Sequence, residues 1–366
     1  PLADDVLKDV AAMLPRVAAG ESSFRIGESE DPAPEEKALL TGRLGIELLV
    51  PLRWRDDLLG AVLLGSKLTG TRFSSEDVTL LTTLAAQVSV SLQNALLLRE
   101  RVAVARFEEE LNLARQIQQT SLLSVFPAIP RCDVHALYIP SRQVGGDFYD
   151  VVQVGDGSYL IAIADVSGKG MPAALLSSML QAALRTQSSS AAALGTILKN
   201  INTLLFRSTA IHQFATFFLA RVDGETLRLT FSNAGHNWPV VFRPGGERTY
   251  LERGGTVLGI MEDVEFEEAQ VVLGPGDLVV LYTDGISEAA NAIGDQFGED
   301  RLCDAVRDMP RGLPAREVAD RLMAALREFL GDVEPQDDMT LLVLRVTERV
   351  AAERVPGRTP EAVAAR

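Results

Sequence analysis

Two hydrophobic patterns follow one another along the chain. Apolar residues recur every three or four positions from about Ser75, and no strong helix breaker occurs until Pro127. Beyond that point, short apolar runs alternate with turns that contain Gly and Asp, which is typical of strands. The chain is therefore predicted to hold two folded parts joined by a long helix.

The first part is predicted to contain a β-hairpin followed by the start of that helix. Residues 46–52 and 58–64 are strand-like runs joined by a polar segment, and Ser75 precedes two acidic residues that favour a helix N-terminus. The helix carries an approximate heptad seam, which fits a dimeric signalling helix and equally a surface helix packed on its own domain. The seam consists of Leu81, Leu84, Val88, Ser91, Ala95, Leu98, Val102 and Ala105.

The second part is predicted to be an α+β domain. Strands are expected at 132–139, 148–154, 159–165, 214–222, 227–232, 278–283 and 339–346, and helices at 173–187, 194–208 and 315–330. Short Gly-containing turns between neighbouring strands favour antiparallel pairing. Residues 348–366 are rich in Ala, Arg and Glu and are predicted to form a flexible tail.

Charge and cysteine content narrow the classes of function. The 35 basic and 50 acidic residues leave a formal net charge of −15, which opposes binding to nucleic acid or to anionic membrane surfaces. No uninterrupted apolar run approaches the roughly 20 residues of a membrane span. Cys132 and Cys303 are far apart, which argues against a disulfide framework or a thiolate zinc site. Both are expected to be small core residues, and the location is predicted to be cytoplasmic.

Acidic residues stand where predicted strands end, and they carry the candidate chemistry. They are Asp147, Asp165, Asp284 and Asp337. A hairpin turn centred on Asp156 places Asp147 opposite Asp165, at the roughly 4.5–5.5 Å where like charges destabilise a sheet. Either one carboxyl is protonated or a cation lies between them, and the two further acids favour the cation. Carboxylates without Cys or His are preferred ligands of Mg²⁺ and Mn²⁺.

A rival interpretation comes from the segment that follows Asp165. Gly168-x-Gly170-x-x-Ala173, between a strand and a helix, matches a dinucleotide-binding fingerprint. Three features oppose it: Asp165 would repel a pyrophosphate, no acid between residues 185 and 223 is available to hold a ribose, and the surrounding strands are predicted to be antiparallel.

Two polar residues near these motifs are expected to have structural roles. Asp150 is an odd number of positions from Asp147, so on a regular strand it points to the opposite face. His236 lies in a polar turn at a strand end, where a buried hydrogen-bonding role is favoured over proton transfer.

Five motifs together resemble a known family. In order, they are Val144-Gly145-Gly146-Asp147-Phe148-Tyr149-Asp150, Asp165-Val166-Ser167-Gly168-Lys169-Gly170, Asn233-Ala234-Gly235-His236, Thr283-Asp284-Gly285 and Asp337-Asp338-Met339-Thr340. This order resembles that of the bacterial SpoIIE/RsbU-like phosphatases, which are metal-dependent serine/threonine phosphatases of type 2C (PPM). The resemblance covers about residues 117–347. It implies an α-β-β-α sandwich of two antiparallel sheets with two Mn²⁺ or Mg²⁺ ions at one end.

The resemblance also implies a role for each site residue. Asp165 would bridge both ions with help from the carbonyl of Val166. Asp284 and Asp337 would hold one ion, and Asp147 would support the other. Asp337 is preferred over Asp338 because the second residue of this motif varies in the wider family. The implied substrate is a phosphorylated anti-sigma-factor antagonist of the STAS type.

Two departures from the family pattern concern phosphate binding. Gln143 stands where many relatives carry an acid, and the phosphate-binding arginine of eukaryotic members has no obvious counterpart. Lys169 and Arg142 are the candidates for this role. A phosphatase-like scaffold that acts by partner binding alone is the alternative function, although the presence of all the acids argues against it.

The N-terminal part resembles the last part of a GAF sensor domain, whose first part is expected to be short or absent. The predicted division is a partial GAF-like segment at 1–98, a linker helix at 99–128, a phosphatase domain at 129–347 and the tail at 348–366. The helix would transmit the state of the sensor, and a homodimer through this helix is possible.

Overall fold

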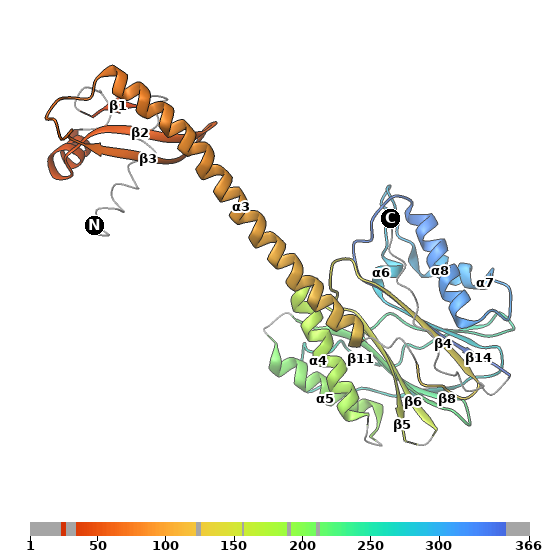
Figure 1. Cartoon of the computed structure of the whole chain (residues 1–366). Coiled ribbons are helices and arrows are strands. Elements are labelled where there is room, and N and C mark those ends of the chain that lie inside the picture. Colours follow the sequence, from red (N-terminus) through yellow and green to blue (C-terminus); the bar gives the residue numbers. More distant parts are fainter. Residues whose placement is uncertain are drawn as a thin grey trace. The chain divides into compact units, whose positions relative to one another are not determined.

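The computed structural model describes residues 23–26, 34–121, 126–155, 157–188, 192–209 and 213–348. The chain forms two compact units, residues 1–109 and 110–366 (Figure 1). Asp156, the expected centre of the hairpin, and residues 349–366 of the expected tail lie outside the described residues.

The first unit is built on a three-stranded antiparallel sheet in the order β1 (Phe24–Arg25), β2 (Ile46–Trp54) and β3 (Asp57–Gly65). The predicted hairpin is confirmed by the pairing of β2 with β3. One small core joins this sheet to the π-helix η1 (Ala38–Arg43), which follows the short helix α2 (Pro34–Lys37). A second core joins it to Ala85 of the long helix.

The long helix α3 (Ser75–Ser121) has 47 residues and begins where the sequence predicts. The backbone N–H of Ser74 donates to Asp77 at 2.6 Å and that of Asp77 donates to the Ser74 hydroxyl at 3.2 Å, which is a reciprocal cap. Residues 75–118 contain an 18-residue window that is apolar enough to cross a membrane by length and composition, and 11% of it is buried. One such helix is weak support for a membrane span.

Two sheets form the centre of the second unit. The first has the strand order β10 (Arg248–Tyr250), β9 (Val240–Phe242), β13 (Leu278–Tyr282), β14 (Met339–Val346), β4 (Cys132–Ile139). The second has the order β11 (Gly254–Gly255), β8 (Arg228–Ala234), β7 (Ala215–Asp223), β6 (Ser158–Val166), β5 (Phe148–Val154), with β12 (Ala269–Val272) also paired to β8. β11 pairs with β8 in parallel, and the other described pairings are antiparallel.

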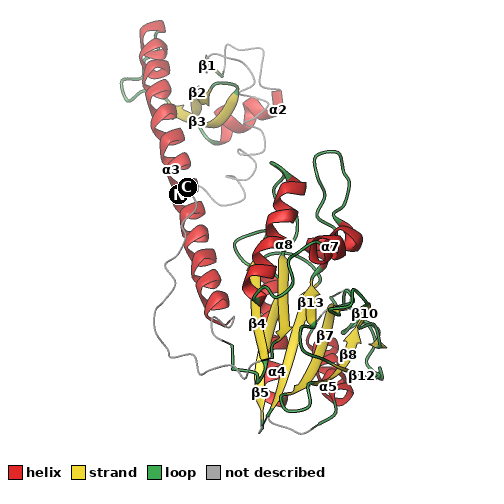
Figure 2. Cartoon of the chain, turned by 90° about the vertical axis from the view of Figure 1, so that its right-hand side faces the viewer, coloured by secondary structure: helices red, strands yellow, loops and turns green. Residues whose placement is uncertain are grey.

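Helices cover the outer faces of both sheets. α4 (Met171–Gln187) and α5 (Leu194–Ser208) pack on the six-stranded sheet, while α7 (Gly298–Arg307) and α8 (Ala315–Leu330) pack on the five-stranded sheet. Figures 1 and 2 show the two helix pairs with the strands between them. The predicted α-β-β-α sandwich is therefore confirmed.

Strand β6 shows why its sequence is a continuous apolar run. Leu160, Ala162 and Ala164 pack toward the helices, and Ile161 and Ile163 pack toward the other sheet. A strand covered on both faces needs apolar residues at successive positions rather than at alternate ones.

The dinucleotide-binding alternative is wrong. That fold needs parallel strands, whereas β6 pairs antiparallel with both β5 and β7. The Gly168-x-Gly170 segment instead connects β6 to α4, with Gly170 at the N-cap of the helix.

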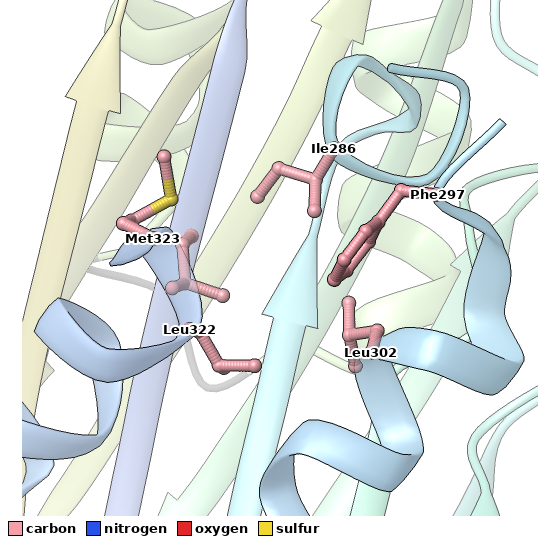
Figure 3. A pocket seen from close by; sticks show the side chains of 6 residues that line it. Ile286, Phe297, Leu302, Leu322 and Met323 are labelled. Atoms are coloured by element: carbon pink, nitrogen blue, oxygen red, sulfur yellow. The ribbon is translucent and has the colours of Figure 1, made fainter. Parts of the chain in front are cut away.

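A small apolar pocket lies between the five-stranded sheet and its helices (Figure 3). It is lined by Ile286, Phe297, Leu302, Leu322, Met323 and Leu341. Its free volume is about 10 Å³, close to the minimum that one water needs, and these side chains belong to the core beneath α7 and α8. The pocket is part of the packed interior and offers no polar side chain to a ligand.

Candidate active site

The predicted acids lie where strands from both sheets end. Phe148 pairs with Ala164, so the next pair in the register is Asp147 with Asp165, as the sequence predicts. Asp284 begins the short helix α6 (Asp284–Ser287) directly after β13, and Asp337 lies two residues before β14. Hydrogen bonds from the β13–β14 side to Asp147 join the two sheets at this edge.

Asp147 is buried and held by two threonines. Its side chain is 1% exposed, and Oδ2 accepts hydrogen bonds from Thr283 Oγ1 at 2.7 Å and Thr340 Oγ1 at 2.6 Å. Burial and the charge of Asp165 raise the pKa of Asp147 well above its usual value, while the threonine hydroxyls oppose this shift. Because Oδ2 is occupied by both hydroxyls, Oδ1 is the oxygen left for further interactions.

Asp165 has a strongly shifted pKa. Burial, followed by the charges of Asp284 and Asp337, raises its pKa to about 7, and a hydrogen bond with Asp147 lowers it. The pKa values of both carboxyls are thus raised by burial and by like charges across the hairpin register.

Asp337 and Asp338 have different surroundings. Asp338 is buried and accepts hydrogen bonds from the backbone N–H of Ser141 at 2.7 Å, from its hydroxyl at 3.0 Å, and from the backbone N–H of Gly146 at 2.7 Å. The side chain of Asp337 is 44% exposed and pairs with Lys169 at 2.8 Å. Asp338 therefore holds the loop before β5, and Asp337 has the freer carboxylate.

Lys169 lies among the acids. Its Nζ also donates to the carbonyl of Gln336 at 2.6 Å, and its charge partly offsets the rise in the pKa of Asp284 that burial, Glu288 and Asp337 produce. Arg142, the other candidate for phosphate binding, is exposed. The Lys169 ammonium is thus engaged by the acids in this structure rather than directed to open solvent.

Gly146 allows a close approach beside the Val166 carbonyl. A Cβ at Gly146 would lie 2.7 Å from the Val166 oxygen and 3.2 Å from the Cβ of Ala173. Gly145 leaves no room for a side chain either, because it lies against Asp338 and Tyr138. A side chain at Gly146 would cover the carbonyl that the resemblance assigns to a metal.

The side chains and carbonyls at this edge offer oxygen ligands, which hard divalent cations such as Mg²⁺ and Mn²⁺ prefer. The donors are carboxylate and carbonyl oxygens, and burial together with the charges of neighbouring acids raises the pKa values of Asp147 and Asp165. Within the part of the chain that is described, no three or more His, Cys, Asp or Glu side chains are grouped so that they could hold a metal ion, and the Asp337 carboxylate is paired with Lys169 instead.

The residues expected to be structural are confirmed as such. Asp150 is buried, and Arg185 Nε and Nη2 of α4 donate to it at 2.6 and 3.2 Å. His236 is 3% exposed and its Nδ1 lies 2.8 Å from the Thr216 hydroxyl. Cys132 and Cys303 are free and buried in two of the cores.

The burial of His236 predicts that the stability of the folded protein depends on pH. Burial lowers its pKa from 6.5 to about 3, so between these values the unfolded chain binds the additional proton and the folded protein loses stability as pH falls. The stabilising contribution of the neutral His236 side chain is fully present above pH 6.5. We expect the stability advantage of the wild type over His236→Gln to shrink between pH 7.5 and pH 5, measured by urea unfolding in EDTA. An equal difference at both pH values would contradict this.

Sequence reasoning missed the residues that orient the acids. Thr283 and Thr340 stand within quoted motifs, but their contacts with Asp147 depend on bringing together segments 136 and 193 residues apart. Asp338 was considered only as an alternative to Asp337. Its position next to a predicted strand gave no sign that it would bind the Ser141–Gly146 loop.

Comparison with known proteins identifies the family. Residues 155–347, more than half of the chain, match the family Stage II sporulation protein E (SpoIIE), and residues 7–92 match the GAF domain. The chain is 31% identical to phosphoserine phosphatase RsbU of Bacillus subtilis over 247 residues, which covers 65% of this chain and 70% of RsbU. The chain belongs to the SpoIIE family. It is a protein serine/threonine phosphatase with an N-terminal GAF domain, in a family that depends on metal ions.

Solved structures agree with this assignment. The PP2C domain of SiaA from Pseudomonas aeruginosa is 28% identical, has a TM-score of 0.58, and the match covers 66% of this chain and 98% of that domain. The PP2C domain of SpoIIE from B. subtilis, with a fragment of its regulatory domain, is 22% identical with a TM-score of 0.54. That match covers 61% of this chain and 65% of the other, and it supports the SpoIIE-type fold alone.

Other relatives are matched over a smaller part of their length. The chain spans 41% of protein IcfG of Synechocystis sp., at 27% identity over 64% of this chain, and 58% of phosphoserine phosphatase RsbP of B. subtilis. The GAF match at residues 7–92 lies within the segment 1–98 that was predicted to be GAF-like, and it includes residues that the structure does not describe.

Proposed function

We propose that this SpoIIE-type enzyme removes phosphate from phosphoserine or phosphothreonine of an anti-sigma-factor antagonist of the STAS type. The observation that carries the proposal is the meeting of Asp147 and Asp165 at one edge, where Asp284 and Asp337 raise the pKa of Asp165. The substrate class rests on the resemblance to RsbU-like phosphatases, and the name of the relative RsbU supports the reaction.

We assign the metal ligands residue by residue. Asp165 would hold two Mn²⁺ or Mg²⁺ ions with help from the carbonyl of Val166, Asp284 and Asp337 would hold one of these ions, and Asp147 would support the other. Bound ions of this kind supply an activated water and offset the negative charge of the phosphate. The absence of Cys and His from this donor set supports Mn²⁺ or Mg²⁺ over softer metals.

The surrounding residues prepare the site. Thr283 and Thr340 fix the orientation of the Asp147 carboxylate, and Asp338 fixes the loop that precedes it. If metal binding released Lys169 from Asp337, its ammonium would supply a positive charge for an incoming phosphate. Without a cation, the crowded acids would repel a phosphate dianion, so substrate binding depends on metal binding.

The test is single-turnover release of phosphate from a phosphoserine-containing STAS protein. We expect release with Mn²⁺ and none with EDTA. Binding of the STAS protein without release in Mn²⁺ would instead support the phosphatase-like scaffold that acts by partner contact. Release from an unrelated phosphoprotein at the same rate would overturn the substrate assignment but keep the enzymatic one.

Regulation by the N-terminal unit is part of the proposal. α3 is one continuous helix that begins after the hairpin of that unit and ends before the phosphatase strands. We expect Ala103→Pro, which breaks a helix interior at a cost of about 3 kcal/mol, to change the hydrolysis rate of the full chain while leaving Mn²⁺ affinity unchanged. Ala103→Gly, at about 1 kcal/mol, serves as the milder control. A wild-type rate for Ala103→Pro would remove the basis for this coupling.

A homodimer through α3 and a cytoplasmic location complete the proposal. The seam residues Leu84, Val88, Leu98 and Val102 are between 44% and 64% exposed, which leaves apolar surface for a second copy of the helix. Sedimentation equilibrium of the full chain measures this directly. The net charge of −15 supports a role away from anionic membranes and nucleic acids.

A further inference from the structure

Three large apolar side chains are exposed near the end of β6 that carries Asp165. Phe214 is 37% exposed, Ile260 55% and Met261 51%, and we call these three residues the apolar rim. Phe214 lies directly beside the acidic edge, because the Ser167 N–H donates to its carbonyl at 2.9 Å and its own N–H donates to the Ser167 hydroxyl at 2.9 Å. Ser167 follows Asp165 by two positions.

The segment that carries Ile260 and Met261 lies on the other side of β7 from β6. Ala215 and Leu258 exchange backbone hydrogen bonds at 3.0 and 2.8 Å, and Ala215 also pairs with Val166 of β6. Neighbouring strands are about 4.8 Å apart, so this segment lies two strand spacings, roughly 10 Å, from the end of β6. The apolar rim therefore flanks the acidic edge on the side of β7.

A buried amide fixes the backbone of this segment. Asn202 of α5 has 0% of its surface exposed. Its Nδ2 donates to the carbonyls of Met261 and Glu262 at 2.8 and 2.9 Å, and its Oδ1 accepts from the Gly259 N–H at 2.8 Å. A buried amide is costly unless it is hydrogen-bonded, and these three bonds all go to one short segment. The side chains of Ile260 and Met261 are thus presented to solvent on a fixed backbone.

We propose that the apolar rim is a docking surface for the phosphoprotein substrate. This inference rests on the proposed function. A phosphoserine side chain is short, so a folded substrate has to bring its backbone close to the acidic edge, and its surface then covers the residues beside that edge. Exposed apolar clusters mark protein interfaces, and side chains on a fixed backbone lose little freedom on binding. The rim supplies affinity for the substrate protein without contacting its phosphate.

A protein substrate is favoured over other occupants of the rim. A second copy of the chain seated there would cover the acidic edge and exclude a phosphoprotein, which opposes the phosphatase activity. An anionic membrane surface is opposed by the net charge of −15.

The test compares Ile260→Ser with Val272→Ser, a matched change at the opposite end of the same sheet. Val272 is 60% exposed and pairs with Arg228, at the far end of β8 from Ala234. With the full chain in Mn²⁺, kcat/KM is measured for a phosphoserine-containing STAS protein and for p-nitrophenyl phosphate, and the ratio of the two values is taken. We expect Ile260→Ser and Met261→Ser each to lower this ratio roughly tenfold, and Val272→Ser to keep the wild-type ratio.

A wild-type ratio in both rim variants would overturn the inference. An equal loss on the two substrates gives that same result, because it leaves the ratio unchanged and shows that the rim acts on the catalytic edge itself. An unchanged ratio together with a shift in the sedimentation equilibrium of Ile260→Ser would assign the rim to a second copy of the chain. Failure of the proposed function is distinguishable, since the wild type would then release no phosphate from the STAS protein, and the docking role would fall with it.

Discussion

Asp165→Asn is expected to abolish Mn²⁺-dependent hydrolysis of a phosphoserine substrate and to raise the melting temperature of the metal-free protein. Hydrolysis should fall at least roughly a thousandfold, because several kcal/mol of transition-state stabilisation depend on the ions that Asp165 is proposed to bridge. Stability should rise because the amide removes a negative charge that lies beside Asp147 and close to Asp284 and Asp337.

The gain in stability from Asp165→Asn is expected to depend on pH. The folded-state pKa of Asp165 is about 7 against a usual 3.8, so the folded protein binds more protons than the unfolded chain between these values. The metal-free wild type therefore loses stability from this group as pH rises from 3.8 to about 7. We expect the advantage of Asp165→Asn to be larger at pH 8 than at pH 4 in EDTA. Asp332→Asn, at an exposed position, is the control. Retained Mn²⁺-dependent activity, or a lower melting temperature at pH 8, would contradict the assignment.

Substitutions of Asp337 and Asp338, the two acids of the last motif, are expected to affect Mn²⁺ binding and stability differently. Asp337→Ala is expected to weaken Mn²⁺ binding by roughly a hundredfold or more. It should cost less than about 1 kcal/mol of unfolding free energy, because its ion pair with Lys169 is partly exposed. Asp338→Ala should cost about 3 kcal/mol, because it leaves the backbone N–H groups of Ser141 and Gly146 without their acceptor.

Urea unfolding in EDTA and Mn²⁺ titration of each variant measure the two effects. The comparison decides which acid is the ligand, since the variants differ by one position in the chain. A large loss of stability in Asp337→Ala, together with normal Mn²⁺ affinity, would assign the ligand role to Asp338 instead.

The strands of the sandwich were predictable because most are covered on both faces. The ranges predicted for β4, β5 and β14 agree with the structure, as do those for α5 and α8. Short elements were not predicted, among them β9 to β12 and the helices α6 and α7. Strands of two to four residues, such as Gly254–Gly255, carry too few positions for a periodic pattern, and their pairing is set by neighbours distant in sequence.

The meeting of Asp147 and Asp165 was predictable because it is a local consequence of one hairpin register. The surroundings of Asp147 were not, since Thr283 and Thr340 reach it from the other sheet. Sequence motifs mark the acidic residues, but the neutral groups that orient them are determined by tertiary packing.

The covering of β6 on both faces has a consequence for divergence within the family. Each substitution along this strand enlarges or shrinks one of two separate cores, so the strand offers no solvent-facing position at which mutations can accumulate freely. Evolutionary change in substrate preference is then expected to concentrate in the loops and on the outer faces of the helices, leaving the two packed sheets and their acidic edge as an inherited framework.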